Sequence, residues 1–251
     1  MPRPDEPKQA VSLSEHEGAL RDALMSTPGY TAADWATSNL ASIIHLAGEG
    51  QWGAQQHEAR ARAIMLLAVR LLRFSRATMA VAAAGWEIEA RGMVRQVIEA
   101  HARLRQVAGD DTDATARQWL EGKPPTGIGA AIRAAAPDLD PDAAKGMYRA
   151  LSQDAHADVA AITRTLTTVD DDLRAEIAWG PQRTDDTRLT LLICATFTAE
   201  SATEVAVEAS VEHPNREELM SYLQRVSGAL ARVMEGDAGP PTLSDDGSAG
   251  G

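Results

Sequence analysis

The sequence is poor in cysteine, in aromatic residues and in long apolar runs. Its single cysteine, Cys194, excludes a disulfide framework, a zinc finger and an iron–sulfur cluster. Aromatic residues make up only 4% of the chain, and no segment approaches the roughly 20 uncharged residues of a membrane-spanning helix. The first residues, MPRPDEPKQ, lack the apolar core of a signal peptide. We therefore expect a cytoplasmic protein that does not enter a membrane.

Lysine is also scarce, with 3 residues against 21 arginines, and the net charge of the chain is −12. This excess of negative charge argues against a DNA partner, because phosphate neutralisation supplies most non-specific affinity for nucleic acid. The charge is uneven, however: residues 57–105 contain nine arginines and four glutamates, a net charge of +5. The segment forms either a locally basic surface or a helix pair that is balanced by acidic neighbours.

Alanine is the abundant residue, with 47 copies, and this composition favours helices that pack closely through small side chains. Proline, glycine and charged residues dominate at both ends. We therefore expect a disordered N-terminus at residues 1–11 and a disordered, acidic, Gly/Pro-rich tail at 236–251. The remaining residues, 12–235, are predicted to form a single all-α domain.

Capping and helix-breaking residues predict a bundle of about six to eight helices. Ser14 with Glu17 starts the first helix, and Thr31 with Asp34 starts the second. Gly85 separates two long helices at 55–84 and 86–107, and shorter helices follow near 112–121 and 127–136. Two more long helices are expected at 141–166 and 186–211. Between them, a short irregular or extended insertion is predicted near 167–184, with an extended piece at 176–179.

Motifs for metal, nucleotide or nucleophile chemistry are absent. No Glu-x-x-His pair of a di-iron bundle occurs, and no Walker-type or dinucleotide-binding glycine loop is present. Cys194 lies inside an apolar helix, which is the setting of an inert buried thiol. We therefore predict no cofactor and no metal ion.

Two polar groups of residues stand out on neighbouring predicted helices. Arg95 and Glu99 lie one turn apart beside the apolar stripe of their helix. Ser152 and His156 lie one turn apart at the edge of the stripe in the helix after Pro141. These four side chains are well placed to meet. They would then form a polar network that fixes how the two helices pack.

The residues of these two groups also occur in a pattern that resembles a known protein family. The pattern Arg-x-x-x-Glu (Arg95, Glu99), followed by Tyr-x-x-Leu-Ser-x-x-x-His (Tyr148 to His156), resembles a bacterial all-α domain family of unknown function over about residues 60–210. More distantly, the chain is similar to the HEPN superfamily, whose signature is Arg-x(4–6)-His. The resemblance implies a metal-independent ribonuclease of the toxin or phage-defence type. It also implies a dimer in which the arginine and histidine of two protomers meet.

Two pairs fit that signature, and helix geometry separates them. Arg95 and His101 lie about 120° apart around the helix, with His101 on the apolar stripe, so we expect His101 to be a core residue. Arg149 and His156 lie within about 20° of each other, roughly 10 Å apart along the axis. In a ribonuclease, His156 would act as general acid or base and Arg149 would stabilise charge on the phosphoryl oxygens.

Two functions are therefore expected from the sequence. In the first, the protein is a HEPN-like ribonuclease with Arg149 and His156 as catalytic residues. Arg95, Glu99, Ser152 and Tyr148 then support them as a polar network. In the second, the protein is a non-catalytic interaction module or scaffold in which this network only holds helices together. Self-association is expected in either case, with RNA or another protein as a further partner.

Overall fold

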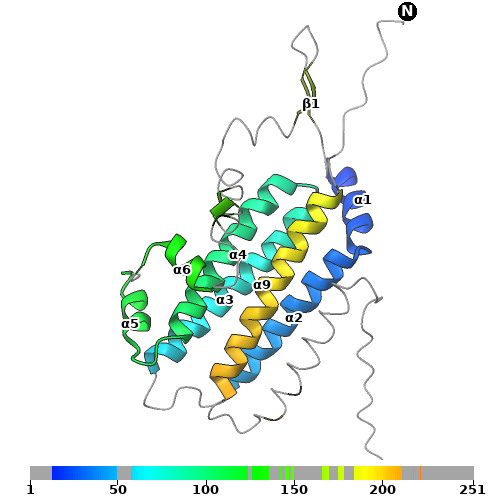
Figure 1. Ribbon diagram of the computed structural model, residues 1–251. Helices are drawn as coiled ribbons and strands as arrows, with labels where there is room; N and C mark the ends of the chain where they lie inside the picture. The colour runs from blue at the N-terminus through cyan, green and yellow to red at the C-terminus, as the bar shows by residue number, and fades with distance from the viewer. Residues whose placement is uncertain are drawn as a thin grey trace, which may run out of the picture.

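The computed structural model describes residues 13–49, 58–123, 126–135, 142, 145–146, 148–149, 166–169, 175–177, 184–210, 217 and 221. These residues form an all-α bundle, which confirms the fold class expected from the sequence (Figure 1). The helices with described bounds are α1 (Leu13–Met25), α2 (Pro28–Glu49), α3 (Glu58–Ala83), α4 (Glu87–Ala108), α5 (Ala114–Leu120), α6 (Ile128–Ala135) and α9 (Thr184–Ser210).

Four long helices, α2, α3, α4 and α9, make the bundle. α9 packs along α2, α3 packs along α4, and α9 also contacts both α3 and α4. The two short helices lie beside this second pair, with α6 against α4 and α5 against α3 (Figure 1). α9 and α3 therefore each contact all three of the other long helices.

The core combines a few large aliphatic side chains with many alanines. Leu40 of α2, Ile64 and Leu71 of α3, Leu104 of α4 and Leu191 of α9 are all fully buried. Each such side chain stabilises the fold by about 1.5–3 kcal/mol through removal from water. The alanines between them carry little side-chain bulk, which lets the helix axes approach closely and explains how a chain with few aromatic residues fills its interior.

The start of α2 corrects one expectation. The capping residues Thr31 and Asp34 predict a start at Thr31, whereas the helix begins at Pro28. The Oγ1 atom of Thr27 accepts a hydrogen bond from the backbone N–H of Tyr30 at 3.4 Å. Threonine is a preferred residue just before a helix, and proline suits the first helical position because no backbone N–H is needed there. This earlier start signal overrides the one at Thr31.

The predicted break between α3 and α4 at Gly85 is confirmed. Gly85 has a φ of 86°, in the left-handed region that glycine adopts without steric cost. Its N–H donates to the carbonyl oxygen of Ala82 at 3.0 Å, and the N–H of Trp86 donates to that of Val81 at 3.1 Å. These bonds satisfy carbonyl groups at the end of α3. The tight turn makes α3 and α4 adjacent partners in the bundle.

A short hairpin occupies part of the predicted insertion. Strand β1 (Leu166–Val169) pairs antiparallel with strand β2 (Ala175–Ile177). The second strand overlaps the extended piece expected at 176–179, and most of the first lies in the insertion expected to be irregular or extended near 167–184. Leu166 is the exception, because it is predicted to end the preceding helix and is instead the first residue of β1. β1 contains two threonines and a valine, and these β-branched residues favour extended backbone over helix.

Within α9, the segment Thr187–Glu208 is long and apolar enough to cross a membrane by length and composition. Half of that segment (50%) is buried inside the bundle. Its buried residues include the hydroxyl-bearing Thr198 and Ser201, which contact other helices through hydrogen bonds. Packing of this half against other helices accounts for the apolar residues that it contains.

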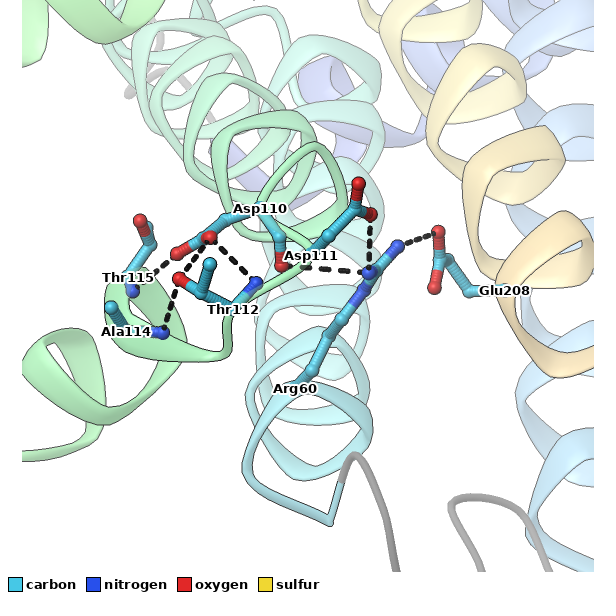
Figure 2. A network of polar contacts seen from close by, with 7 residues as sticks. All are labelled: Arg60, Asp110, Asp111, Thr112, Ala114, Thr115 and Glu208. Carbon is cyan, nitrogen blue, oxygen red and sulfur yellow. Dashed lines mark hydrogen bonds and ion pairs between the residues drawn. The ribbon is translucent and has the colours of Figure 1, made fainter.

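Arg60 fastens the start of α3 to two distant parts of the chain (Figure 2). Its Nη2 atom lies 2.5 Å from Oε1 of Glu208, near the end of α9. Its Nη1 atom donates to the carbonyl oxygen of Asp110 at 3.5 Å and to Oδ1 of Asp111 at 3.4 Å. The side chains of Arg60 and Glu208 are only 14% and 19% exposed, against 98% for Asp111. The contact with Glu208 is therefore the one that solvent screens least.

The carboxylate of Asp110 organises the loop before α5 (Figure 2). Its Oδ1 atom accepts hydrogen bonds from the backbone N–H and the hydroxyl of Thr112, at 2.9 and 2.6 Å. Its Oδ2 atom accepts one from the backbone N–H of Thr115 at 2.7 Å. These donors, Thr112 first, hold the pKa of Asp110 well below its usual value. The charged carboxylate thus satisfies backbone donors at the start of α5.

Candidate functional site

Three polar side chains meet on the face of α4. Arg95 and Glu99 lie one helical turn apart, and Nε of Arg95 donates to Oε1 of Glu99 at 2.8 Å. Tyr148 is a helical residue much later in the chain, and its hydroxyl donates to the same oxygen at 2.7 Å. The guanidinium of Arg95 also lies over the Tyr148 ring, 5.2 Å from its centroid. We call these three residues the Glu99 cluster.

The Glu99 cluster is half-buried and has fixed charges. The side chains of Arg95 and Glu99 are 20% and 21% exposed. Burial raises the pKa of Tyr148, and the hydrogen bond to Glu99 raises it further. Burial alone would lower the pKa of Arg95, but the hydrogen bond and charge of Glu99 outweigh it, so the net shift is upward. Near neutral pH the cluster holds a cation and a neutral phenol, and neither exchanges protons readily.

Arg103 extends the same face of α4 by one further turn. Its Nη2 atom donates to the carbonyl oxygen of Thr126 at 2.7 Å, and its Nη1 atom donates to Oε1 of Gln106 at 2.8 Å. The amide of Gln106 in turn donates to the Thr126 hydroxyl at 2.8 Å. Burial lowers the pKa of Arg103, while the charge of Glu99 opposes this shift. These bonds fasten the polar face of α4 to the segment that precedes α6.

The structure brings some of the expected site residues together. Arg95, Glu99 and Tyr148 meet as described, and Arg149 follows Tyr148 in the helix. The side chain of Arg149 is exposed, and among the described residues it has no hydrogen-bond or ion-pair partner. Ser152 and His156 lie outside the described residues. Tyr148 is thus anchored to α4 while its neighbour in sequence presents a free guanidinium to solvent.

His101 is buried, as its place on the apolar stripe predicted. Its side chain is 1% exposed and its ring lies 5.1 Å from that of Phe197, centroid to centroid. Nδ1 lies 2.9 Å from Oγ of Ser201, and Nε2 lies 3.2 Å from Oε2 of Glu200. The hydrogen bond with His101 lowers the pKa of Glu200, against an opposing effect of burial. Both ring nitrogens of this core histidine therefore have polar partners on α9.

A serine, a histidine and a carboxylate are the groups of a nucleophilic triad, but this set cannot act as one. Ser201 is 0% exposed and His101 is 1% exposed, so no substrate reaches the serine oxygen. Sequence reasoning missed Glu200 and Ser201 as partners of His101. Glu200 and Ser201 follow the apolar stretch of α9, which indicates polar groups next to the core but not their partner.

Cys194 and the acidic residues offer no reactive centre in the described part of the chain. Burial raises the pKa of Cys194 to about 11, and its Sγ atom lies 4.0 Å from the carbonyl oxygen of Ser75. Across the described ranges, no three His, Cys, Asp or Glu side chains come together as a metal-binding group. The chemistry open to this region is therefore that of fixed charges and hydrogen bonds.

Comparison of the chain with protein-family models, with curated proteins and with solved structures finds no match. The Glu99 cluster and the exposed Arg149 beside it are therefore the features that bear on function.

Proposed function

We propose that the protein is a HEPN-like, metal-independent ribonuclease in which Arg149 and His156 are the catalytic residues. The observation that supports this proposal is the exposed, unpaired guanidinium of Arg149 next to the anchored Tyr148. An arginine that binds phosphate must be accessible and free of other anions, and Arg149 meets both conditions. The Glu99 cluster would hold its helix against α4.

The chemistry follows from the residue types. His156 takes the proton of an RNA 2′-hydroxyl, whose oxygen then attacks the adjacent phosphorus. The bond from phosphorus to the 5′-oxygen breaks, this oxygen takes up the proton that His156 removed from the 2′-hydroxyl, and the products are a 2′,3′-cyclic phosphate and a 5′-hydroxyl. Arg149 stabilises the negative charge that builds up on the phosphoryl oxygens. No electron transfer or metal ion is needed in this scheme.

We also propose the setting in which this activity operates. The protein is a cytoplasmic homodimer, and the arginine of one protomer meets the histidine of the other, as in the superfamily that the chain resembles. RNA is the substrate, and a separate protein partner restrains the activity. The dimer and the RNA substrate rest on the resemblance of the Tyr148-to-His156 segment.

A second function is favoured by a different observation. In the Glu99 cluster the carboxylate oxygen Oε1 already accepts two hydrogen bonds, one from Arg95 and one from Tyr148. A network that is satisfied within the protein serves helix packing without any ligand. The alternative is therefore a non-catalytic scaffold or interaction module in which this network is purely structural.

Cleavage of end-labelled tRNA and total RNA in the presence of EDTA tests the first proposal. We expect the wild-type protein to cleave RNA and the Arg149→Ala and His156→Ala variants to lose cleavage at equal folded concentration. Arg133→Ala, an exposed arginine of α6, is the matched control and should cleave like wild type.

Thermal and urea unfolding of the same variants separate the two functions. A catalytic His156 predicts nearly unchanged stability in His156→Ala. A structural His156 predicts a loss of about 1–3 kcal/mol, because a buried partner is left without its hydrogen bond. If well-folded wild-type protein leaves both RNA pools intact, the proposed ribonuclease function is wrong and the scaffold function is the one that remains.

A further inference from the structure

We propose that the outward face of α3 is a docking site for an acidic amphipathic helix of another protein. The face consists of Arg62, Leu66, Val69 and Arg73, which we call the α3 seam. It lies on a different helix from the Glu99 cluster and from Arg149. The proposal therefore stands whether or not the protein cleaves RNA.

The four residues of the α3 seam share one line along the helix. Their successive spacings are four, three and four residues, so at 100° per residue they fall within a sector of about 60°. This alternation is the pattern of core positions in a coiled coil, where apolar side chains of one helix pack against those of another. Among the described residues, α3 contacts α2, α4 and α9, and to a smaller extent α5 and α1. The seam is exposed and lies on the side of α3 opposite its buried residues Ile64, Leu67 and Leu71.

The centre of the α3 seam is aliphatic and exposed. Leu66 is 47% exposed and Val69 is 37% exposed, one turn apart. Single exposed aliphatic residues are ordinary on protein surfaces, but two at coiled-coil spacing form a contact surface for a helix. Packing a partner helix against them would remove both from water.

The ends of the α3 seam carry positive charges without partners. Arg62 and Arg73 are exposed, and among the described residues neither has a hydrogen bond or an ion pair. The other arginines of this helix differ. Arg70 donates to Gln96 at 3.3 Å and lies over the ring of Phe74, and Arg76 pairs with Asp34 at 2.6 Å. Two free guanidinium groups thus flank the aliphatic pair.

This combination of charge and shape identifies the occupant. A helix with aliphatic residues on one stripe and glutamate or aspartate beside it would bury Leu66 and Val69 and pair with both arginines. A phosphate backbone would use the arginines but would gain nothing from the aliphatic pair. The exposed aliphatic centre therefore favours a protein helix over RNA.

A second copy of the chain is a poor occupant. The seam packed against itself would bring arginines together, which is repulsive. The glutamates in the second half of α9 are already engaged within the molecule, in the pairs Glu200–His101, Glu204–Arg105 and Glu208–Arg60. The glutamates of α9 are therefore not available to the seam of a second copy, and the occupant that we propose is a helix of a different protein.

A designed peptide tests the proposal on the full-length protein. The probe is a fluorescent helix about three heptads long, with leucine at positions a and d and glutamate at e and g. We expect its anisotropy to rise on titration with wild-type protein. Affinity should fall by about tenfold or more in the double variant Leu66→Ser/Val69→Ser, and by a similar factor in Arg62→Glu/Arg73→Glu. Leu189→Ser, a 57% exposed leucine of α9, is the control and should bind like wild type.

A charge swap makes the test specific to the seam. The same peptide with lysine in place of glutamate should bind Arg62→Glu/Arg73→Glu and not the wild type. Equal affinity for all variants, or no binding of the acidic peptide to wild-type protein, would overturn the proposal. If a short RNA binds and its affinity depends on the two arginines but not on Leu66 and Val69, the ligand of the seam is nucleic acid and the proposal of a protein helix is wrong. Peptide binding that occurs only after removal of residues 236–251 would make the chain's own tail the occupant instead.

Discussion

Tyr148 donates its hydrogen bond to the same oxygen of Glu99 that accepts the Nε hydrogen of Arg95. One carboxylate oxygen thus joins two donors from parts of the chain that are distant in sequence. Because Tyr148 is also stacked on Arg95, the helix that carries Arg149 is held to α4 by an aromatic contact and a hydrogen bond together. Both proposed functions require this attachment.

Tyr148→Phe removes the hydrogen bond and keeps the ring. We expect the free energy of unfolding to fall by about 1 kcal/mol, the usual contribution of one hydrogen bond in a half-buried site. Urea unfolding followed by circular dichroism measures the change. Tyr30→Phe is the control, because among the described residues no partner is found for the Tyr30 hydroxyl. Equal losses in both variants would mean that the bond to Glu99 contributes nothing specific.

The Oγ atoms of Ser75 and Thr198 lie 2.8 Å apart in the buried interface of α3 with α9. Each hydroxyl also lies within hydrogen-bond distance of a carbonyl oxygen of its own helix, at Leu71 and Cys194. Ser75→Ala or Thr198→Val alone should cost about 1–2 kcal/mol, because the remaining hydroxyl loses its partner across the interface. The double variant should cost less than the two together, with a coupling of about 1 kcal/mol. Strict additivity in urea unfolding would show that the two hydroxyls act independently.

Asp110→Ala should destabilise the protein by about 1 kcal/mol at neutral pH, because the backbone donors at the start of α5 lose their acceptor. The neighbouring Asp111→Ala, at a side chain 98% exposed, should have little effect.

The contribution of Asp110 should also depend on pH. Since its pKa is depressed in the folded state, the stabilisation is fully present above the unfolded value near 3.8 and is lost as the pH falls through the lower folded value. The difference between wild type and Asp110→Ala, measured by urea unfolding, should therefore shrink below about pH 4. A constant difference would exclude a role for the charged carboxylate.

Cys194 should resist thiol reagents in the folded protein. Its thiol is buried, and burial raises its pKa to about 11, so almost no thiolate is present at neutral pH. We expect no absorbance change with a disulfide reagent under native conditions and one thiol per chain in guanidinium chloride. Rapid labelling of the native protein would mean that α9 separates from α3 on the timescale of the reaction.

The helices of this fold could be predicted because their signals are local. Gly85 ends α3 by its own backbone preference, and the spacing of Arg95 and Glu99 places them on one face regardless of tertiary structure. The start of α2 was missed for an equally local reason, since the signal at Thr27 and Pro28 precedes the one at Thr31. The individual helices of the bundle could thus be predicted from short stretches of sequence.

Contacts between distant segments could not be predicted in the same way. The partners of Arg60 lie at Asp110 and Glu208, and those of His101 lie on α9, so each contact depends on how the helices pack. The sequence indicated that His101 is a core residue but carried no signal for the pairing of its two nitrogens. Register between helices is set by the whole interface rather than by any one motif.

The late position of α9 in the chain has a consequence for protein synthesis. α2 is made early, yet its most extensive packing partner is α9, which leaves the ribosome after the other long helices, α3 and α4. α3 and α4, joined by the turn at Gly85, are able to pair as soon as both have emerged. The nascent chain therefore carries the alanine-rich face of α2 exposed until translation is nearly complete, a period in which chaperones or a neighbouring nascent chain have access to it.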